Sequence, residues 1–109
     1  MNVQIFGKSK CFDTKKAERW FKERRIKYQY IDLTKYGMSL GELRSVRGAV
    51  GLDALINSEA RGAEMVLYLA HDDDKLERLF EEPALISTPV VRNGRQATVG
   101  YCPDVWSTW

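Results

Sequence analysis

The first third of the chain changes its hydrophobic periodicity twice, and this constrains the fold more than any other feature. Residues 3–6 form a short alternating run that ends at Gly7, as is typical of a strand. Ala17, Trp20 and Phe21 then recur at the i, i+3, i+4 spacing of an amphipathic helix, and residues 27–33 alternate again. The pattern predicts a strand–helix–strand unit, which is normally parallel with a right-handed crossover. Either Asp13 or Thr14 can cap the start of its helix.

The middle of the chain is predicted to be helical. Ser39 is followed three residues later by Glu42, a capping-box pattern that marks the start of a helix. Gly48 and Gly51 are expected to break that helix. Further apolar stripes at helical spacing continue as far as Pro83, which ends the last of them.

The last quarter returns to strands. Two short runs flank Asn93-Gly94, a turn pair that two-residue hairpin loops prefer, and Val105, Trp106 and Trp109 follow at helical spacing. The resulting order is typical of an α/β thioredoxin-type domain with a mixed four-stranded sheet. The four strands are expected near residues 2–6, 28–33, 88–92 and 95–99.

Length and composition limit what else the chain can be. With 109 residues, 44% of them hydrophobic, it is expected to form one domain over residues 1–109, too apolar to be disordered. It has no apolar run of about 18 residues and no signal peptide, so we expect no membrane contact and a cytoplasmic location. The chain has one histidine and two cysteines that are far apart in the sequence, so we expect no metal site.

The positive charge is concentrated at the N-terminal end. Residues 1–27 carry nine lysines and arginines against three acidic residues. Such a cluster can serve nucleic-acid binding, but the aromatic residues in this stretch fall at core spacing. We therefore expect a solvated helix face and not a nucleic-acid interface.

Cys11 stands between the first strand and the first helix. The free N–H groups and the dipole at a helix start stabilise an anion, so a thiolate there has a lowered pKa, expected below about 8.5. Lys8, Lys10 and Lys15 add a positive field. The alternative is a buried structural cysteine. Thr14 makes the motif C-x-x-T, which excludes a local disulfide; its hydroxyl can donate to the thiolate or cap the helix.

Several stretches resemble the arsenate reductase (ArsC) family, including its Spx and YffB-like branches. They are residues 6–17 (Phe-Gly-Lys-Ser-Lys-Cys-Phe-Asp-Thr-Lys-Lys-Ala), 31–33, 88–94 (Thr-Pro-Val-Val-Arg-Asn-Gly) and 99–101. The resemblance implies a thioredoxin-like (glutaredoxin-like) fold with a helical insertion, residues 38–84, between the second and third strands. It also implies Cys11 as nucleophile, a cis Pro89 facing it, and pairing of the backbone of Thr88 with a thiol substrate.

The sequence departs from the resemblance at the arginines that bind the oxyanion. Arsenate reductases hold the oxyanion with three arginines, and here only Arg61, displaced by a few residues, could serve in the insertion. Thr88 stands at the second position and Tyr101-Cys102 at the third. An oxyanion needs multidentate charged donors, so arsenate reduction is disfavoured and the Spx/YffB side preferred.

Three functions follow in order of preference. The first is a thiol oxidoreductase that reduces a mixed disulfide or small substrate, with glutathione as co-substrate or with glutaredoxin or thioredoxin as partner. Lys8, Lys15 or Arg92 would then pair with glutathione carboxylates. The second is an Spx-like regulator that binds a protein such as RNA polymerase, although Thr14 removes the C-x-x-C switch of many such proteins. The third is arsenate reduction.

Cys102, the only other thiol, lies just after the expected fourth strand. It is either a resolving cysteine for Cys11 or a structural residue. The resemblance places it where the family has an arginine, a longer side chain, whereas a disulfide needs Cα atoms within about 7 Å. We therefore predict that both cysteines are unpaired.

Overall fold

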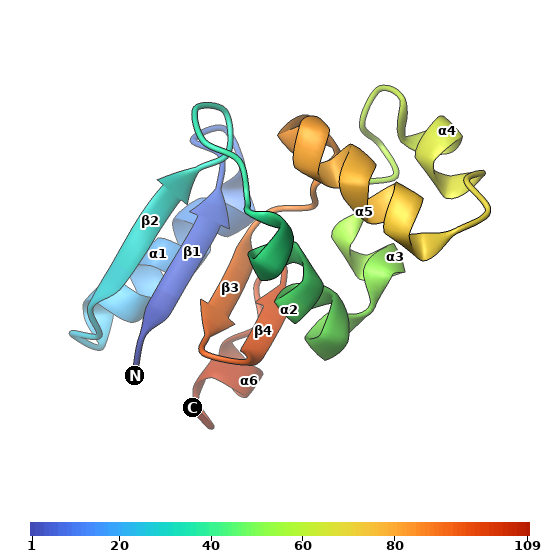
Figure 1. The fold of residues 1–109 in the computed structure, drawn as a ribbon. Coiled ribbons are helices and arrows are strands. Elements are labelled where there is room, and N and C mark those ends of the chain that lie inside the picture. Colours follow the sequence, from blue (N-terminus) through green and yellow to red (C-terminus); the bar gives the residue numbers. More distant parts are fainter.

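The core of the molecule is a mixed sheet of four strands, which Figure 1 shows from one side. The structure is a computed structural model that describes residues 1–109. The strands are β1 (Val3–Gly7), β2 (Tyr28–Asp32), β3 (Val90–Asn93) and β4 (Gln96–Val99). Their order is β2-β1-β3-β4, with β1 parallel to β2 and β3 antiparallel to both β1 and β4. The predicted sheet is thus confirmed, with strand ends shifted by at most two residues.

One face of the sheet is covered by α1 (Phe12–Glu23) and the short α6 (Pro103–Trp106). An aromatic cluster fills this layer: the ring of Trp106 lies 5.5 Å from that of Trp20 and 5.1 Å from that of Phe21. The buried indole N–H of Trp106 donates to the hydroxyl of Thr98 at 2.8 Å. Burying a polar group is tolerated when it is hydrogen-bonded, so this contact fixes α6 against β4.

The other face is covered by the helices between β2 and β3 (Figure 1). Phe6 and Val90 of the sheet belong to one buried cluster with Leu43, Leu55 and Leu79 of these helices. No helix is both long enough and apolar enough to cross a membrane. The elements of this layer are α2 (Leu40–Val50), α3 (Leu52–Leu55), α4 (Ala63–Leu67), α5 (Asp72–Glu81) and a 3-10 turn, η1 (Pro83–Leu85).

The structure corrects three local expectations. The hairpin loop is Gly94-Arg95, not Asn93-Gly94, because Asn93 still pairs with Gln96 and Gly94 takes the positive φ of 63° that the first loop position needs. Helix α2 runs through Gly48, a tolerated glycine, and ends at Gly51, where φ is 85°. The N-cap of α1 is Cys11 itself, not Asp13 or Thr14. The predicted capping box at the start of α2 is confirmed.

Candidate active site at Cys11

The turn between β1 and α1 places Cys11 at the start of the helix. The backbone N–H of Cys11 donates to the carbonyl of Lys8 at 3.0 Å, which closes the turn. Its own carbonyl accepts the N–H of Lys15 at 3.2 Å, the first hydrogen bond of α1. The side chain is partly exposed at the N-terminal end of the helix. The sulfur is therefore free to react at the positive end of a 12-residue helix.

One partner of the thiol comes from a distant part of the sequence. The thiol of Cys11 donates to the backbone carbonyl of Thr88 with an Sγ–O distance of 3.7 Å. This meeting follows from topology, because β3 runs antiparallel to β1 and Phe6 pairs with Val90, so β3 begins where β1 ends. The Thr88–Pro89 peptide bond is cis, as the resemblance implied. The structure thus brings Cys11, Thr88 and Pro89 together.

Thr14 is buried beside the turn that carries Cys11. Its side chain is only 1% exposed, and its hydroxyl accepts the backbone N–H of Lys8 at 3.4 Å. The position beside it must be glycine, since a Cβ on Gly7 would overlap the side chain of Thr14. Because the Thr14 oxygen already accepts one hydrogen bond, its proton remains available to the Cys11 sulfur.

The surroundings lower the pKa of Cys11. Burial alone raises it, but hydrogen bonds from the side chains of Thr14 and Thr88 and from the backbone N–H groups of Thr14 and Asp13 outweigh the burial. Hydrogen bonds to the charged form of a group favour that form. The result is a thiol that ionises more readily than a free cysteine.

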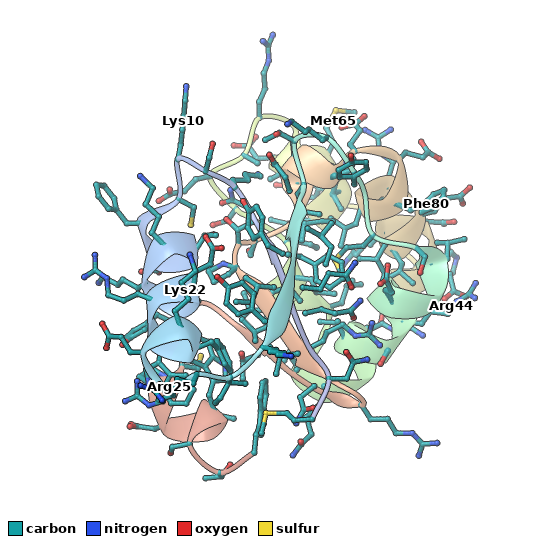
Figure 2. The ribbon with its side chains drawn as sticks, turned by 90° about the vertical axis from the view of Figure 1, so that its left-hand side faces the viewer. Lys10, Lys22, Arg25, Arg44, Met65 and Phe80 are labelled. Carbon is teal, nitrogen blue, oxygen red and sulfur yellow. The ribbon has the colours of Figure 1, made fainter.

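The lysines expected to stabilise the thiolate make other contacts or extend into solvent. The ammonium group of Lys8 donates to the carbonyl of Ala84 at 3.3 Å, which ties the active-site turn to η1. Lys10 is exposed and extends into solvent (Figure 2). The ammonium of Lys15 lies over the ring of Phe12, 6.0 Å from its centroid. The groups that lower the pKa of Cys11 are hydroxyls and backbone N–H groups, not these charges.

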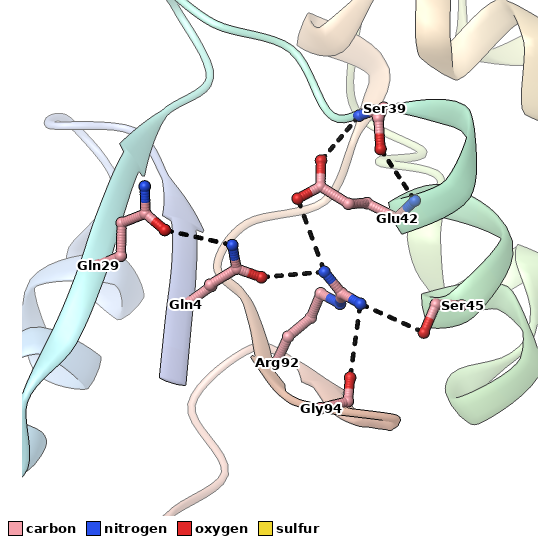
Figure 3. Close-up of polar contacts among 7 residues, drawn as sticks. All are labelled: Gln4, Gln29, Ser39, Glu42, Ser45, Arg92 and Gly94. Carbon is pink, nitrogen blue, oxygen red and sulfur yellow. Dashed lines mark hydrogen bonds and ion pairs between the residues drawn. The ribbon is translucent and has the colours of Figure 1, made fainter. Parts of the chain in front are cut away.

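Arg92 is placed away from the thiol, contrary to the expectation that it binds a thiol substrate. Its guanidinium donates to the side-chain oxygen of Gln4 at 2.9 Å and lies 3.6 Å from a carboxylate oxygen of Glu42 (Figure 3). It also contacts the hydroxyl of Ser45 at 3.4 Å. Side chains alternate along a strand, so Arg92 shares the face of Val90, against the helical insertion, whereas α1 packs on the other face.

Cys102 lies at the start of α6, where its thiol donates to the carbonyl of Val99 at 3.4 Å. It packs against the aromatic cluster of the α1 layer. Both cysteines are free, as predicted. No group of three or more His, Cys, Asp or Glu side chains is placed to hold a metal ion.

Two residues near the site were not identified from the sequence. Phe12, directly after Cys11, leaves 80% of its side chain exposed. The exposure of Phe12 was predictable from the buried stripe of Ala17 and Phe21, because Phe12 falls on the opposite side of that helix. Tyr30 of β2 has a raised pKa, first through burial and then through the negative charges of neighbours that include the Cys11 thiolate.

The chain is similar in sequence to curated proteins along most of its length. No family model matches the chain. The global transcriptional regulator Spx 2 of Oceanobacillus iheyensis is 31% identical over 110 residues, covering 95% of this chain and 80% of the relative. The uncharacterised protein YusI of Bacillus subtilis is 26% identical over 111 residues, covering 95% of this chain and 94% of the relative.

Solved structures share the fold. The YffB protein superposes with a TM-score of 0.83 at 24% identity, covering 97% of this chain and 96% of that one. An arsenate reductase from Vibrio cholerae gives a TM-score of 0.83 at 22% identity, with 96% and 94% covered. The thioredoxin-like fold, the sequence match to Spx 2 and the arrangement around Cys11 lead to one conclusion: the chain is a member of the arsenate reductase (ArsC) family, in its Spx and YffB-like branch.

Proposed function

We propose that the chain is a thiol oxidoreductase that uses Cys11 as its single nucleophile to reduce mixed disulfides of glutathione. The observation that supports this function best is the partly exposed Cys11 thiol, whose pKa is lowered by Thr14 and Thr88. The thiolate is the nucleophile in disulfide exchange, so a lowered pKa increases its fraction at neutral pH.

The reaction needs two exchange steps. In the first, the Cys11 thiolate attacks the glutathione sulfur of a mixed disulfide; a Cys11–glutathione disulfide forms, and the substrate thiolate leaves and takes up a proton. In the second, the thiolate of a free glutathione attacks the glutathione sulfur of that disulfide. Glutathione disulfide leaves and the Cys11 thiolate is regenerated. Across the two steps, the mixed disulfide and one free glutathione become the substrate thiol and glutathione disulfide.

The open side of the site suits such a substrate. The backbone of Thr88 flanks the sulfur, and Lys10 and Lys15 are exposed cations within four residues of Cys11. Carboxylates of glutathione would pair with these cations in solvent, where each pair contributes about 0.2–1 kcal/mol. A glutaredoxin or thioredoxin dithiol would serve the second step by the same chemistry.

Turnover of a peptide–glutathione mixed disulfide tests the proposal, with glutathione disulfide formation followed through a coupled reductase. The wild-type chain is expected to accelerate the reaction, Cys11→Ser to abolish it and Cys102→Ser to retain it. A Cys11→Ser variant as active as wild type would overturn the proposal, as would a rate no higher than that of glutathione alone.

A second candidate is a regulator that acts by binding a protein. Its support is the relative described as a global transcriptional regulator, Spx 2. Binding of RNA polymerase by the purified chain, undiminished in the Cys11→Ser variant, would favour this function over the enzymatic one. Absence of that binding together with disulfide turnover would exclude it.

Arsenate is a weaker candidate substrate. Arg61 precedes α4, which Figure 1 places on the far side of the insertion from α1. Thr88 and Tyr101 occupy the other two positions where the family resemblance expects arginines. Arsenate added to the same coupled assay is expected to give no turnover.

A further inference from the structure

The outward face of α1 carries positive charge that the chain itself does not neutralise. Lys15, Arg19 and Lys22 follow one another at i, i+4 and i+7, are exposed and make no ion pair within the chain. Two of the three acidic residues of this helix are already engaged. Asp13 lies 4.0 Å from Lys16, and Glu18 accepts the hydroxyl of Tyr28 at 3.0 Å.

Two shallow hollows border this stripe. One of about 430 Å³ lies on the side of α6, lined by Lys16, Arg19, Trp20, Glu23, Arg24 and Tyr101. One of about 320 Å³ lies on the other side, lined by Lys15, Glu18, Arg19, Lys22 and Glu23. Glu23, which makes no ion pair, is the acidic side chain common to both, and cations outnumber acids around the first.

Aromatic rings hold two of these cations in place. The guanidinium of Arg24 lies 4.0 Å from the ring centroid of Trp20, and the ammonium of Lys16 lies 5.6 Å from that of Tyr101. Cations placed over rings lose less freedom on binding than freely moving side chains, so this part of the face is preorganised for an anionic partner.

The stripe is continuous with the reactive thiol. Phe12, mostly exposed, follows Cys11 directly and lies on the same side of the helix as Lys16 and Arg19. At 1.5 Å per residue, the stripe extends about 16 Å along the axis from Cys11 to Lys22. An extended peptide spans this length with about five residues. Figure 2 shows Lys10, Lys22 and Arg25 along this side and Arg44 on the opposite side.

We propose that the outward face of α1 docks an acidic, extended segment of the protein substrate and so places the glutathione mixed disulfide of that substrate at Cys11. The inference rests on the proposed function for the reaction at Cys11 and adds the chemistry of the substrate. Carboxylates of the segment pair with Lys15, Arg19 and Lys22, and an apolar side chain covers Phe12. A nucleic acid would satisfy the charges but would bring no sulfur to Cys11.

The test uses short peptides that begin with a cysteine joined to glutathione as a mixed disulfide. One peptide continues with aspartate and glutamate, and a matched one with asparagine and glutamine. The Cys11 thiolate attacks the glutathione sulfur, a Cys11–glutathione disulfide forms, and the peptide thiolate leaves with the bonding electrons and takes up a proton. We expect exchange with the acidic peptide to be about tenfold faster at low salt, an advantage that added salt removes.

A matched pair of triple variants locates the effect. Lys15→Ala/Arg19→Ala/Lys22→Ala is expected to lose the advantage of the acidic peptide. Arg44→Ala/Arg61→Ala/Arg95→Ala removes the same charge from exposed positions outside α1 and is expected to keep it. Both variants should react equally with neutral dithiodipyridine, which reports the intact thiol. An α1 variant that keeps the full advantage overturns the docking surface.

Peptide binding measured in the absence of disulfide exchange tests this inference independently of the proposed function. Anisotropy of a labelled acidic peptide is measured with the Cys11→Ser variant, which cannot exchange. Saturable, salt-sensitive binding that the α1 variant loses supports the docking face even if the wild-type chain fails to turn over glutathione mixed disulfides. Tighter binding of a single-stranded oligonucleotide of equal charge overturns it in favour of a nucleic acid.

Discussion

Thr14 connects the reactive sulfur to the end of β1. Its hydroxyl lowers the pKa of Cys11 and accepts the N–H of Lys8, while its methyl group occupies the space that Gly7 leaves open. A single buried side chain therefore sets both the ionisation of the thiol and the shape of the turn that presents it.

Replacing Thr14 by valine keeps the shape and removes the hydroxyl. We expect the pKa of Cys11 to rise, because the thiolate loses a hydrogen bond that favours the charged form. The rate of alkylation by iodoacetamide, measured against pH, should show its inflection at higher pH than in the wild type. Thr108→Val, at an exposed hydroxyl close to the C-terminus, is the control. An unchanged inflection in Thr14→Val would contradict this role.

Gly7→Ala should damage the site through packing. The new Cβ would overlap Thr14, so we expect a loss of about 1–3 kcal/mol in the free energy of unfolding together with slower alkylation of Cys11. Gly48→Ala is the matched control, since a Cβ there meets nothing within 4 Å inside α2. That control should stabilise the chain by about 0.5–1 kcal/mol in denaturant titrations. Equal effects of the two substitutions would refute the argument.

The lowered pKa of Cys11 also predicts how stability changes with pH. Because the folded pKa lies below the unfolded one, ionisation of the thiol favours the folded state. This contribution is fully present above the unfolded pKa and is lost as the pH falls through the folded pKa. The difference in unfolding free energy between wild type and Cys11→Ser should therefore shift in favour of wild type as pH rises across that window. If the difference in unfolding free energy between the two proteins did not change with pH, this prediction would be contradicted.

Among the secondary-structure elements, α2 is attached to the sheet by one polar cluster. Ser39 and Glu42 form the capping box, and the same Glu42 carboxylate faces Arg92 of β3, which also binds Gln4 of β1. Figure 3 shows the cluster, which joins β1, β3 and α2. Arg92 therefore acts on the packing of α2.

Arg92→Ala should lower the stability of the fold without changing the reaction at Cys11. Loss of partly buried charged hydrogen bonds is expected to reduce the unfolding free energy by about 1–3 kcal/mol. The pH profile of Cys11 alkylation and the turnover of mixed disulfide should remain those of wild type at a temperature where the variant is folded. A selective rise in KM for glutathione would instead restore a role in substrate binding.

The elements were largely predictable, whereas the contacts among them were not. Alternation and helical spacing located the four strands and α1, and Ser39 and Glu42 located the start of α2, because these signals are local. The position of Arg92 depends on which helices cover its face of the sheet, a long-range property. The hydrogen bonds that lower the pKa of Cys11 likewise depend on Thr88, which is distant in sequence and was associated with the site only by resemblance.

For the molecule as a whole, the sheet separates two cores. Phe6 and Val90 face the helical insertion, and Ile5 and Val91 face α1 and α6. Cys102 packs against the second core, whereas Cys11 lies at the start of α1 beside Thr88. The two thiols thus have different surroundings and different hydrogen-bond partners.

Mild diamide treatment with glutathione should therefore modify Cys11 and leave no intrachain bridge. Intact-mass and peptide mass spectrometry are expected to show one glutathione on Cys11 and a free Cys102, because the thiol of Cys102 donates to the carbonyl of Val99 and its side chain packs against the aromatic core. Cys102→Ser should give the same result at Cys11. A rapid and complete Cys11–Cys102 disulfide would instead make the chain a two-cysteine enzyme or sensor.

The aromatic cluster has a consequence for spectroscopy. All three tryptophans, Trp20, Trp106 and Trp109, lie in or against the α1 layer, and the helical insertion contains none. Intrinsic fluorescence therefore reports unfolding on that side of the sheet, while far-ultraviolet circular dichroism also registers the helices of the insertion. If the two signals change at different denaturant concentrations, the insertion melts independently of the layer that holds the reactive cysteine.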